Sequence, residues 1–211
     1  MKKTILTISF ALFTNLIFAQ TNWQESSYYS NGLTTSLGKN YELSNLYLDS
    51  AIQINPNKYE YYEQKGLNYF RLNDYKNAII LLNKAIVLNP KCKYALLYRG
   101  YSKAKLEDHR GAINDFDKAI NLLIQLKAKK GELAEALNNR AASKYAIGKY
   151  SETIVDCNLA ISNDKDYSLA YYNKGLAYIE LGQIDNGCIA LSKAGELGFE
   201  LAYDTIKENC Q

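Results

Sequence analysis

The feature that most constrains the fold is a phrase that occurs twice. AIQINP begins at Ala51 and AIVLNP begins at Ala85, 34 residues later, and the two phrases hold the only prolines, Pro56 and Pro90. A fixed interval of about 20 to 50 residues is typical of repeat architectures, in which each repeat is one supersecondary unit. The interval therefore predicts an array of similar units.

The same interval runs through most of the chain. Glycine recurs at Gly32, Gly66 and Gly100, and then at Gly175, which lies 75 residues, or twice 34 plus seven, after Gly100. The extra seven residues fall near residues 127–133. Five units result, with the boundaries 25–58, 59–92, 93–126, 134–167 and 168–201.

Within a unit the apolar spacing is helical. In YKNAIILLNKAIVL, residues 75–88, apolar side chains recur at three- and four-residue steps, which lines one face of a helix. YEYYEQKGLNYFRL forms a second helical stretch before it. A glycine inside a helix costs about 1 kcal/mol relative to alanine, so the recurring glycine indicates a neighbouring helix pressed against it. Proline disfavours helical geometry in the preceding residue, so the repeated phrase ends a helix.

These residues make the chain resemble the tetratricopeptide repeat family. The resemblance is carried in the second and third units by Tyr62, Gly66, Tyr69, Ala78, Leu82, Ala85, Pro90, Gly100, Ala112, Phe116 and Ala119. It covers nearly all of the chain after residue 19 and implies an all-α fold, a right-handed superhelix of antiparallel helix pairs. Ser44, Ala141, Thr153 and the missing proline after units three to five depart from the pattern and bear on the local packing angle.

Two segments lie outside the regular pattern. Stacked helix pairs leave the last apolar face uncovered, and ELAYDTIKENC, residues 200–210, is amphipathic and predicts a capping helix. Unit three lacks its proline, so NDFDKAINLLIQLKAKK is expected to stay helical for about two extra turns and to end at Gly131. The extension is either a longer helix pair or a dedicated docking ridge.

Residues 1–19 are predicted to be a leader. MKKTILTISFALFTNLIFAQ has two lysines, an apolar run from Ile5 and the small residue Ala19, the pattern of a signal peptide cut after that alanine. A membrane anchor is the alternative, but the run is shorter than the roughly 20 residues that cross a bilayer. We expect a mature domain, 20–211, that is periplasmic or secreted, with no stable membrane insertion. The abundant Lys, Asn, Ile and Tyr favour a bacterial source.

Charge and residue types exclude several classes of function. Without Lys2 and Lys3, 23 basic groups face 22 acidic ones, so the chain lacks the basic excess of a nucleic-acid-binding protein. The single histidine, His109, occupies the position of Tyr75 and is expected to pack near a turn. One histidine cannot build a histidine-based metal cluster or a serine triad, and no glycine precedes the Lys-Ser or Lys-Thr pair of a phosphate loop. We expect no enzyme, no cofactor and no metal.

The four cysteines show no CxxC spacing, which argues against a metal knot. Cys157 is predicted to lie in the core. A turn near Gly198 would bring Cys188 level with Cys210, so these two either form a disulfide in an oxidising compartment or remain separate buried thiols. Cys92 follows a loop and could be exposed.

In the family, the first helix of each unit lines a concave groove, so the resemblance implies a binding surface. The inward positions and two basic neighbours are Tyr29, Leu67, Phe70, Arg71, Tyr94, Leu97, Tyr101, Lys105, Tyr145 and Tyr172. Tyrosine offers a large, rigid contact with a polar tip, which suits an extended peptide or a helix of a partner protein. The chain has 19 tyrosines, so packing between units is the other interpretation for each of them.

The implied function is an exported, non-enzymatic scaffold for protein–protein interaction. A subset of the family grips a carboxyl terminus with lysine, asparagine and arginine at inward positions. Here those positions carry Tyr29, Leu33, Gln64, Tyr94 and Tyr98, so that clamp is absent. Two other classes stay open: a carbohydrate-binding module, since stacked tyrosines also hold sugar rings, and an auxiliary subunit of a cell-envelope assembly.

Overall fold

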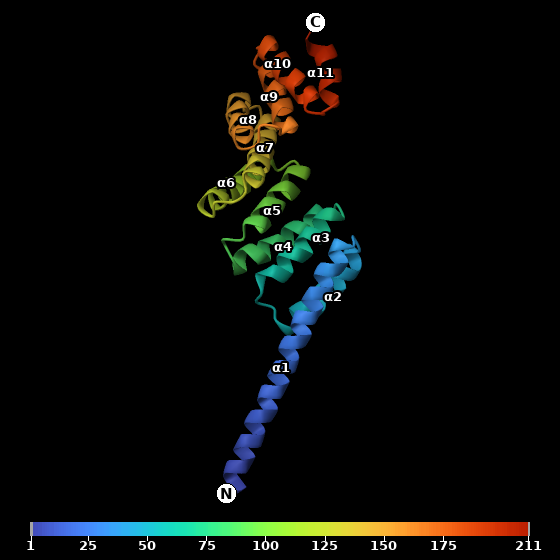
Figure 1. Cartoon of the computed structure of the whole chain (residues 1–211), viewed down its shortest axis with the longest axis vertical. Helices are drawn as coiled ribbons and strands as arrows, with labels where there is room; N and C mark the ends of the chain where they lie inside the picture. The colour runs from blue at the N-terminus through green and yellow to red at the C-terminus, as the bar shows by residue number, and fades with distance from the viewer. Residues whose placement is uncertain (1, 211) are drawn as a thin grey trace. The chain divides into compact units, whose positions relative to one another are not determined.

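The computed structural model describes the backbone of residues 2–210 and the side chains of residues 19–210. The predicted signal peptide covers residues 1–19. The side chains of residues 1–18 lie outside the described part of the chain. In the described part the chain is all-α, as predicted (Figure 1). No helix there combines the length and the apolar character that a membrane span requires.

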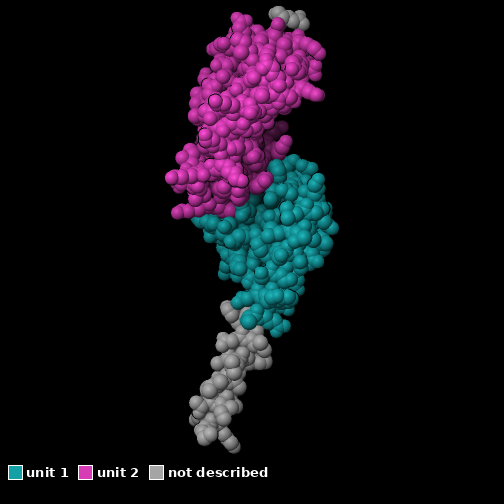
Figure 2. All heavy atoms as spheres, viewed as in Figure 1, with its two compact units in different colours: residues 1–90 teal, residues 91–211 magenta. Residues whose placement is uncertain are grey.

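Eleven helices make up this described part of the chain. Their bounds are α1 (Lys2–Leu37), α2 (Tyr41–Ile54), α3 (Tyr59–Arg71), α4 (Tyr75–Leu88), α5 (Lys93–Lys105), α6 (His109–Gln125), α7 (Lys130–Ala146), α8 (Tyr150–Asn163), α9 (Ser168–Glu180), α10 (Ile184–Glu196) and α11 (Leu201–Asn209). The first ten pack as consecutive pairs, α1 with α2 through α9 with α10, and α11 lies on α10. We call the odd-numbered members of these pairs first helices and the even-numbered members second helices. The chain divides into two compact units, residues 1–90 and residues 91–211 (Figure 2).

The turn inside each pair has the same form throughout the array. The residue two positions before each second helix has a positive φ: Lys39 (62°), Asn73 (60°), Glu107 (64°), Gly148 (77°) and Gly182 (73°). Only glycine adopts this backbone conformation without steric cost, so the last two pairs have the least strained turns. His109 opens α6 at the position that tyrosine occupies in α2, α4 and α8, which agrees with a packing role near the turn.

The recurring glycine lies where the two helices of a pair touch, as the sequence predicted. A Cβ added at Gly66 would lie 2.7 Å from Leu82 Cγ, and one added at Gly100 would lie 2.9 Å from Phe116 Cε1. Real Cβ atoms do not approach so closely, so the second helix would have to move away. Close packing between the helices therefore requires glycine at these two positions.

The insertion in the third pair is organised differently from the prediction. α6 ends at Gln125 and α7 begins at Lys130, so Gly131 lies in the first turn of α7. The expectation that one helix runs to Gly131 is wrong. Lys127 takes a φ of 49°, and the N–H groups of Lys127 and Ala128 donate to the carbonyls of Ile124 and Leu123 at 3.1 and 3.0 Å. These two bonds form a Schellman cap, which ends a helix.

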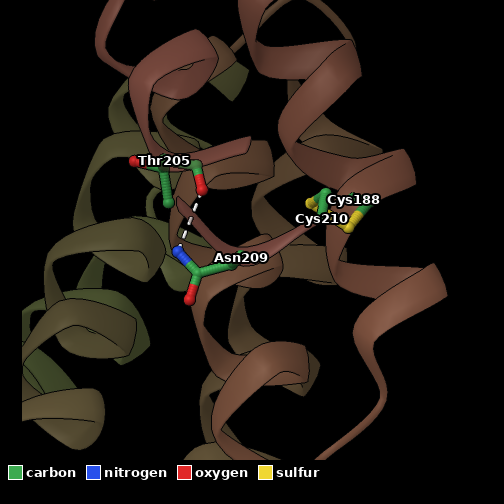
Figure 3. Close-up of a disulfide and its surroundings, with 4 residues drawn as sticks. All are labelled: Cys188, Thr205, Asn209 and Cys210. Atoms are coloured by element: carbon green, nitrogen blue, oxygen red, sulfur yellow. Dashed lines mark hydrogen bonds between the residues drawn. A yellow bond between two sulfur atoms is a disulfide. The ribbon is translucent and has the colours of Figure 1, made fainter. Parts of the chain in front are cut away.

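The C-terminal helix covers the last pair. Ala202 of α11 is fully buried beside Leu191 and Ala194 of α10, and Phe199 and Ile206 pack against this cluster. A disulfide joins Cys188 on α10 to Cys210 after α11, with 5.9 Å between the Cα atoms (Figure 3). The amide of Asn209 donates to the carbonyl of Thr205 at 2.9 Å in the same figure. α11 is thus attached to α10 by both packing and a covalent bond.

The two remaining cysteines are buried thiols. Cys157 is fully buried, as predicted, and burial raises the pKa of its thiol to about 12. Cys92 is only 5% exposed, so the expectation of an exposed Cys92 is wrong. Cys92 is the N-cap residue of α5. Its side chain is buried, although Pro90 and Lys91 in the preceding loop are exposed.

Candidate binding surface on the first helices

The predicted binding residue of α1 rests on a buried polar contact. The ring of Tyr29 packs on the ring of Tyr61 from α3, with 4.9 Å between centroids. Tyr61 is buried and its hydroxyl donates to the carboxylate of Glu25. Lys58 Nζ lies 2.8 Å from Glu25 Oε1. Burial alone would raise the pKa of Glu25, but the bonds from Lys58 and Tyr61 outweigh it and hold the pKa below its usual value.

The other predicted residues of residues 1–90 come from α3. Leu67 and Phe70 are half-buried, and Arg71 is exposed at the end of the helix. The ring centroid of Phe70 is 5.7 Å from that of Tyr75. The guanidinium carbon of Arg71 lies 5.6 Å from the ring centroid of Tyr41, a distance at which a cation is attracted to an aromatic face. Arg71 is therefore positioned by a ring and remains accessible.

In residues 91–211, the predicted tyrosines join neighbouring helices. Tyr101 of α5 donates to Glu135 Oε1 of α7 at 3.2 Å, and Tyr145 of α7 donates to Glu180 Oε1 of α9 at 3.1 Å. Tyr172 of α9 shares a hydrogen bond of 3.3 Å with the hydroxyl of Thr205 in α11.

Two further contacts complete this series. Lys93 Nζ of α5 lies 2.6 Å from Glu132 Oε2 of α7, and Asn173 Nδ2 of α9 donates to Asn138 Oδ1 of α7 at 2.9 Å. We call these five pairs the first-helix ladder: Lys93–Glu132, Tyr101–Glu135, Asn138–Asn173, Tyr145–Glu180 and Tyr172–Thr205. The ladder gives the hydroxyl groups of Tyr101, Tyr145 and Tyr172 a hydrogen-bond partner on another helix.

The same contacts raise the pKa of two of the phenols. Burial and the bond to Glu180 raise the pKa of Tyr145 to about 12. Burial, and then the charge of Glu135, raise the pKa of Tyr101 well above its usual range. Both hydroxyls are therefore hydrogen-bond donors at neutral pH, and each satisfies a carboxylate of the next first helix.

Three predicted residues of α5 differ in accessibility. Tyr94 is 44% exposed, and Lys93 Nζ lies 4.6 Å from its ring centroid. Lys105 is exposed at the end of the helix. Leu97 is only 7% exposed, so its prediction as a surface residue is wrong. The equivalent residue of α9 is Tyr172, whose longer side chain is half-buried, while the short aliphatic side chain of Leu97 ends below the surface.

The sequence interpretation missed two buried charge clusters. Asp115 of α6 is fully buried and accepts from Arg99 Nε at 2.9 Å, with Lys103 Nζ at 2.8 Å. In the next pair, Asp156 of α8 accepts from Arg140 Nε at 2.8 Å.

Asp156 also has Lys144 Nζ 2.9 Å from its Oδ2. Burial would lower the pKa of Arg140, but the bonds to Asp156 and to Asp117 raise it. The signal for these clusters is an arginine followed by lysine four residues later and aspartate sixteen residues later, and it occurs in both units three and four.

A neutral hydrogen-bond network occupies part of the interior of residues 1–90. Asn68 is fully buried and donates to Ser44 Oγ at 2.7 Å and to Asn45 Oδ1 at 2.9 Å, while Ser36 donates to Asn68 Oδ1 at 2.7 Å. Every named group has a partner, so this network stabilises the packing of α1, α2 and α3 without a buried charge.

The described residues show no arrangement for metal chemistry. Among them, no group of three or more histidine, cysteine, aspartate or glutamate side chains could hold a metal ion. The first helices of residues 91–211 carry a row of tyrosines with carboxylates beside them, and Lys105 and Lys130 are exposed lysines of the same helices.

Comparison with known proteins agrees with the helix-pair fold. The model of the tetratricopeptide repeat matches residues 59–92, and a second model of the same repeat matches residues 169–197. No curated protein matches the chain. The solved structure of MamA is 21% identical, with a TM-score of 0.74, and the match covers 82% of this chain and 91% of that one.

Two other solved structures are similar to the same degree. Residues 41 to the end of MamA from Desulfovibrio magneticus RS-1 give a TM-score of 0.74 at 17% identity, covering 82% of this chain and 94% of that one. YrrB, described as a TPR protein with an unusual peptide-binding site, gives a TM-score of 0.74 at 20% identity, covering 85% and 90%. At these identities the likeness shows the fold alone.

Proposed function

We propose that this chain, a tetratricopeptide repeat protein, is exported from the cytosol and binds a peptide segment or a helix of a partner protein on its first helices, without catalysis. Proteins built of these repeats are scaffolds for protein–protein interaction.

The first-helix ladder is the observation that carries the choice of surface. Its hydroxyl groups are already bonded to the next helix, so the rings of Tyr101, Tyr145 and Tyr172 lose little freedom when a partner arrives. Binding is strengthened when the contact groups are ordered beforehand. Tyr94 adds an exposed ring at one end. YrrB, with its peptide-binding site, supports the proposal by analogy of fold.

The composition of the surface favours a protein over a small metabolite. Glu135 and Glu180 lie beside aromatic rings and are exposed, and Lys105 adds an exposed positive charge. Alternating rings, carboxylates and ammonium groups match the alternating apolar and polar groups of a peptide. A non-enzymatic function is further supported by the single histidine, which is half-buried at the start of α6.

Export is supported by two independent features. The first 19 residues have the pattern of a cleaved signal peptide. The disulfide between Cys188 and Cys210 is of a kind that persists in oxidising compartments and is rare in the cytosol. N-terminal sequencing of the protein purified from its native cells is expected to begin at Gln20. A cytosolic protein that retains Met1 would contradict export.

Site-specific crosslinking tests the binding surface. A photoreactive amino acid replaces Tyr94 in one protein and Tyr203, an exposed residue of α11, in a matched control. We expect a partner protein to be crosslinked from Tyr94 in native cells, with the crosslinked segment identified by mass spectrometry, and no such product from Tyr203. Glycan binding that is lost in Tyr101→Ala, with no protein crosslinked from Tyr94, would favour a carbohydrate-binding module instead.

A further inference from the structure

One basic position recurs on the first helices of pairs two to five. It is occupied by Lys65, Arg99, Arg140 and Lys174. In three of these pairs the cation forms an ion pair with a carboxylate of the same chain. Lys65 pairs with Asp49 of α2, Arg99 pairs with Asp115 of α6, and Arg140 pairs with both Asp156 of α8 and Asp117 of α6.

Lys174 is the exception. In pairs three and four, the carboxylate that binds this cation comes from the second helix of the same pair, as Asp115 or Asp156. The equivalent residue in pair five is Ala190. In pairs two and four, a carboxylate also comes from the second helix of the preceding pair, as Asp49 or Asp117. The equivalent residue before pair five is Asn158 of α8. Lys174 is half-buried, and within the described residues it forms no ion pair with a carboxylate.

The missing carboxylate leaves space. An open pocket of about 560 Å³ lies between α9 and α10, and Lys174 and Ala190 both line it. Its walls include Tyr171 and Tyr178 from α9 and Ile189 from α10, and Ile189 is 70% exposed. We call this the α9–α10 pocket. All of its lining residues belong to residues 91–211, so it is a feature of one compact unit.

The groups around Lys174 favour a negative ligand. Its Nζ lies 5.8 Å from the ring centroid of Tyr178, which orients the side chain along α9. Lys193 adds a second ammonium group, which is paired at 3.0 Å with Glu196 at the exposed edge. Cys188 also lines the pocket, and its disulfide to Cys210 fixes α10 against α11 (Figure 3). The pocket therefore combines the ammonium group of Lys174, which has no carboxylate partner among the described residues, with aromatic and aliphatic side chains beside it.

We propose that the α9–α10 pocket binds an aspartate or glutamate side chain of a partner protein. The carboxylate takes the position that Asp156 has beside Arg140 and Lys144, and an apolar residue next to it packs on Ile189. A half-buried ammonium group without a counter-charge is unfavourable, and the incoming carboxylate supplies the missing partner. This is a second docking surface, formed by both helices of the last pair and separate from the first-helix ladder.

An acidic protein segment fits better than other anions for a reason of shape. The two equivalent positions in the same chain are filled by aspartate side chains from a helix that packs alongside, so the geometry around the cation is that of a carboxylate next to a helix. The exposed Ile189 and the two tyrosines require an apolar neighbour for the carboxylate. Inorganic phosphate has no such apolar neighbour.

Selection from a display library tests the proposal with defined ligands. Twelve-residue peptides are selected against the mature full chain. The affinity of each selected peptide, with its C-terminus amidated, is measured by fluorescence anisotropy. We expect selected peptides to contain Asp or Glu beside an apolar residue. Replacement of that Asp by Asn, or of that Glu by Gln, is expected to weaken binding at least tenfold. Lys174→Gln is expected to cause a similar loss. Lys118→Gln, at an exposed lysine of α6, is the matched control and leaves binding unchanged.

A second variant restores the internal carboxylate. Ala190→Asp places an acidic group where pairs three and four have one, so it is expected to pair with Lys174, to retain the helical circular dichroism spectrum and to abolish peptide binding. Tyr94→Ala is expected to leave peptide binding to the pocket intact, which separates this proposal from the proposed function. Peptides that bind Lys174→Gln and Ala190→Asp as tightly as the unchanged protein would overturn the proposal. A library that yields only peptides insensitive to carboxylate replacement would overturn it as well.

Two other occupants are distinguished by the same variants. Self-association in sedimentation experiments that disappears in Lys174→Gln would assign the pocket to a second copy of this chain and would overturn an external partner. Binding of inorganic phosphate alone, with no selected peptide, would overturn a protein ligand.

Discussion

The fourth and fifth helix pairs have the same hairpin form but are held together by different chemistry. In α7–α8 the contact position is Ala141, Thr153 Oγ1 donates to its carbonyl at 3.3 Å, and the buried Asp156 binds two cations. In α9–α10 two glycines face each other: a Cβ at Gly175 would lie 3.0 Å from the carbonyl oxygen of Gly187. The fifth pair has no buried carboxylate at the position of Asp156, and a disulfide ties it to α11.

The difference shows which part of the repeat is essential. Both pairs keep small residues where the helices cross, because only a short side chain lets the two backbones approach. The rest of the interface varies between buried charge and steric packing. The fourth pair therefore depends on buried charge, and the fifth on close contact between its two helices, while a disulfide joins the fifth pair to α11.

The largest expected effect on stability comes from the buried charge that the fourth pair has and the fifth pair lacks. Asp156→Ala leaves the half-buried Arg140 and Lys144 without their shared carboxylate, so the free energy of unfolding is expected to fall by about 3–5 kcal/mol. Urea denaturation monitored by circular dichroism measures the change. Asp117→Ala is the control: Asp117 also binds Arg140, but its side chain is 49% exposed, so a loss of about 1 kcal/mol or less is expected. Equal losses for the two variants would contradict the buried cluster.

The disulfide of the fifth pair gives the next largest effect. Cys188 and Cys210 are 22 residues apart, and a crosslink over such a loop stabilises by about 3 kcal/mol on the chain-entropy account. Cys188→Ala with Cys210→Ala is expected to lower the stability by that amount, as is reduction of the unchanged protein. Thiol titration of the denatured, unreduced protein is expected to find two thiols, Cys92 and Cys157. Four thiols would show that the bond does not form.

The close contact of the fifth pair gives an intermediate effect. A Cβ at Gly175 would also lie 2.7 Å from Leu191 Cγ, so Gly175→Ala is expected to destabilise by about 1–2 kcal/mol because overpacking outweighs the gain in helix propensity. Gly131→Ala is the matched control in α7, since a Cβ there meets nothing within 4 Å. It is expected to stabilise by up to about 1 kcal/mol. A stabilising Gly175→Ala would show that the helices can separate at no cost.

The smallest effect concerns the bond that joins the two pairs. Tyr145→Phe removes the hydrogen bond to Glu180 and is expected to cost about 1 kcal/mol or less, since both side chains reach solvent. The folded-state pKa of Tyr145, about 12, is above its unfolded value near 10, so this stabilisation is fully present below pH 10 and is lost as the pH rises towards 12. Unfolding measured from pH 8 to pH 12 should show a smaller decline for Tyr145→Phe than for Tyr203→Phe, the control on α11. Identical pH profiles would contradict the bond.

Some features were predictable because they depend on local chemistry. The phase of Gly66 and Gly100 predicted the close contacts, and the equivalence of His109 with Tyr75 predicted that His109 lies near the turn between two helices. Other features, such as where a helix ends, depend on local backbone hydrogen bonds that the repeat interval does not indicate. The end of α6 was predicted wrongly because the Schellman cap at Lys127 forms in a residue type with no strong signal for it.

The candidate surfaces were harder to predict than the helices. Sequence analysis placed Leu97 and Tyr172 on the same face, yet only the larger side chain reaches the surface. The partners of the tyrosines, such as Glu180 for Tyr145, lie 35 residues away and depend on how one first helix is rotated against the next. That rotation results from packing of the whole pair, so the ladder could not be read from spacing alone.

The sequence by itself determined the helices, their pairing and the small residues at each crossing, because periodicity and backbone sterics act within a few turns of chain. Only the tertiary structure decided which charges are neutralised internally. Whether a lysine such as Lys174 has a carboxylate partner depends on side chains from two other helices. Lys144, which is also half-buried, has one. Electrostatic neutralisation is a property of three-dimensional proximity, and it is this property that distinguishes the last pair from those before it.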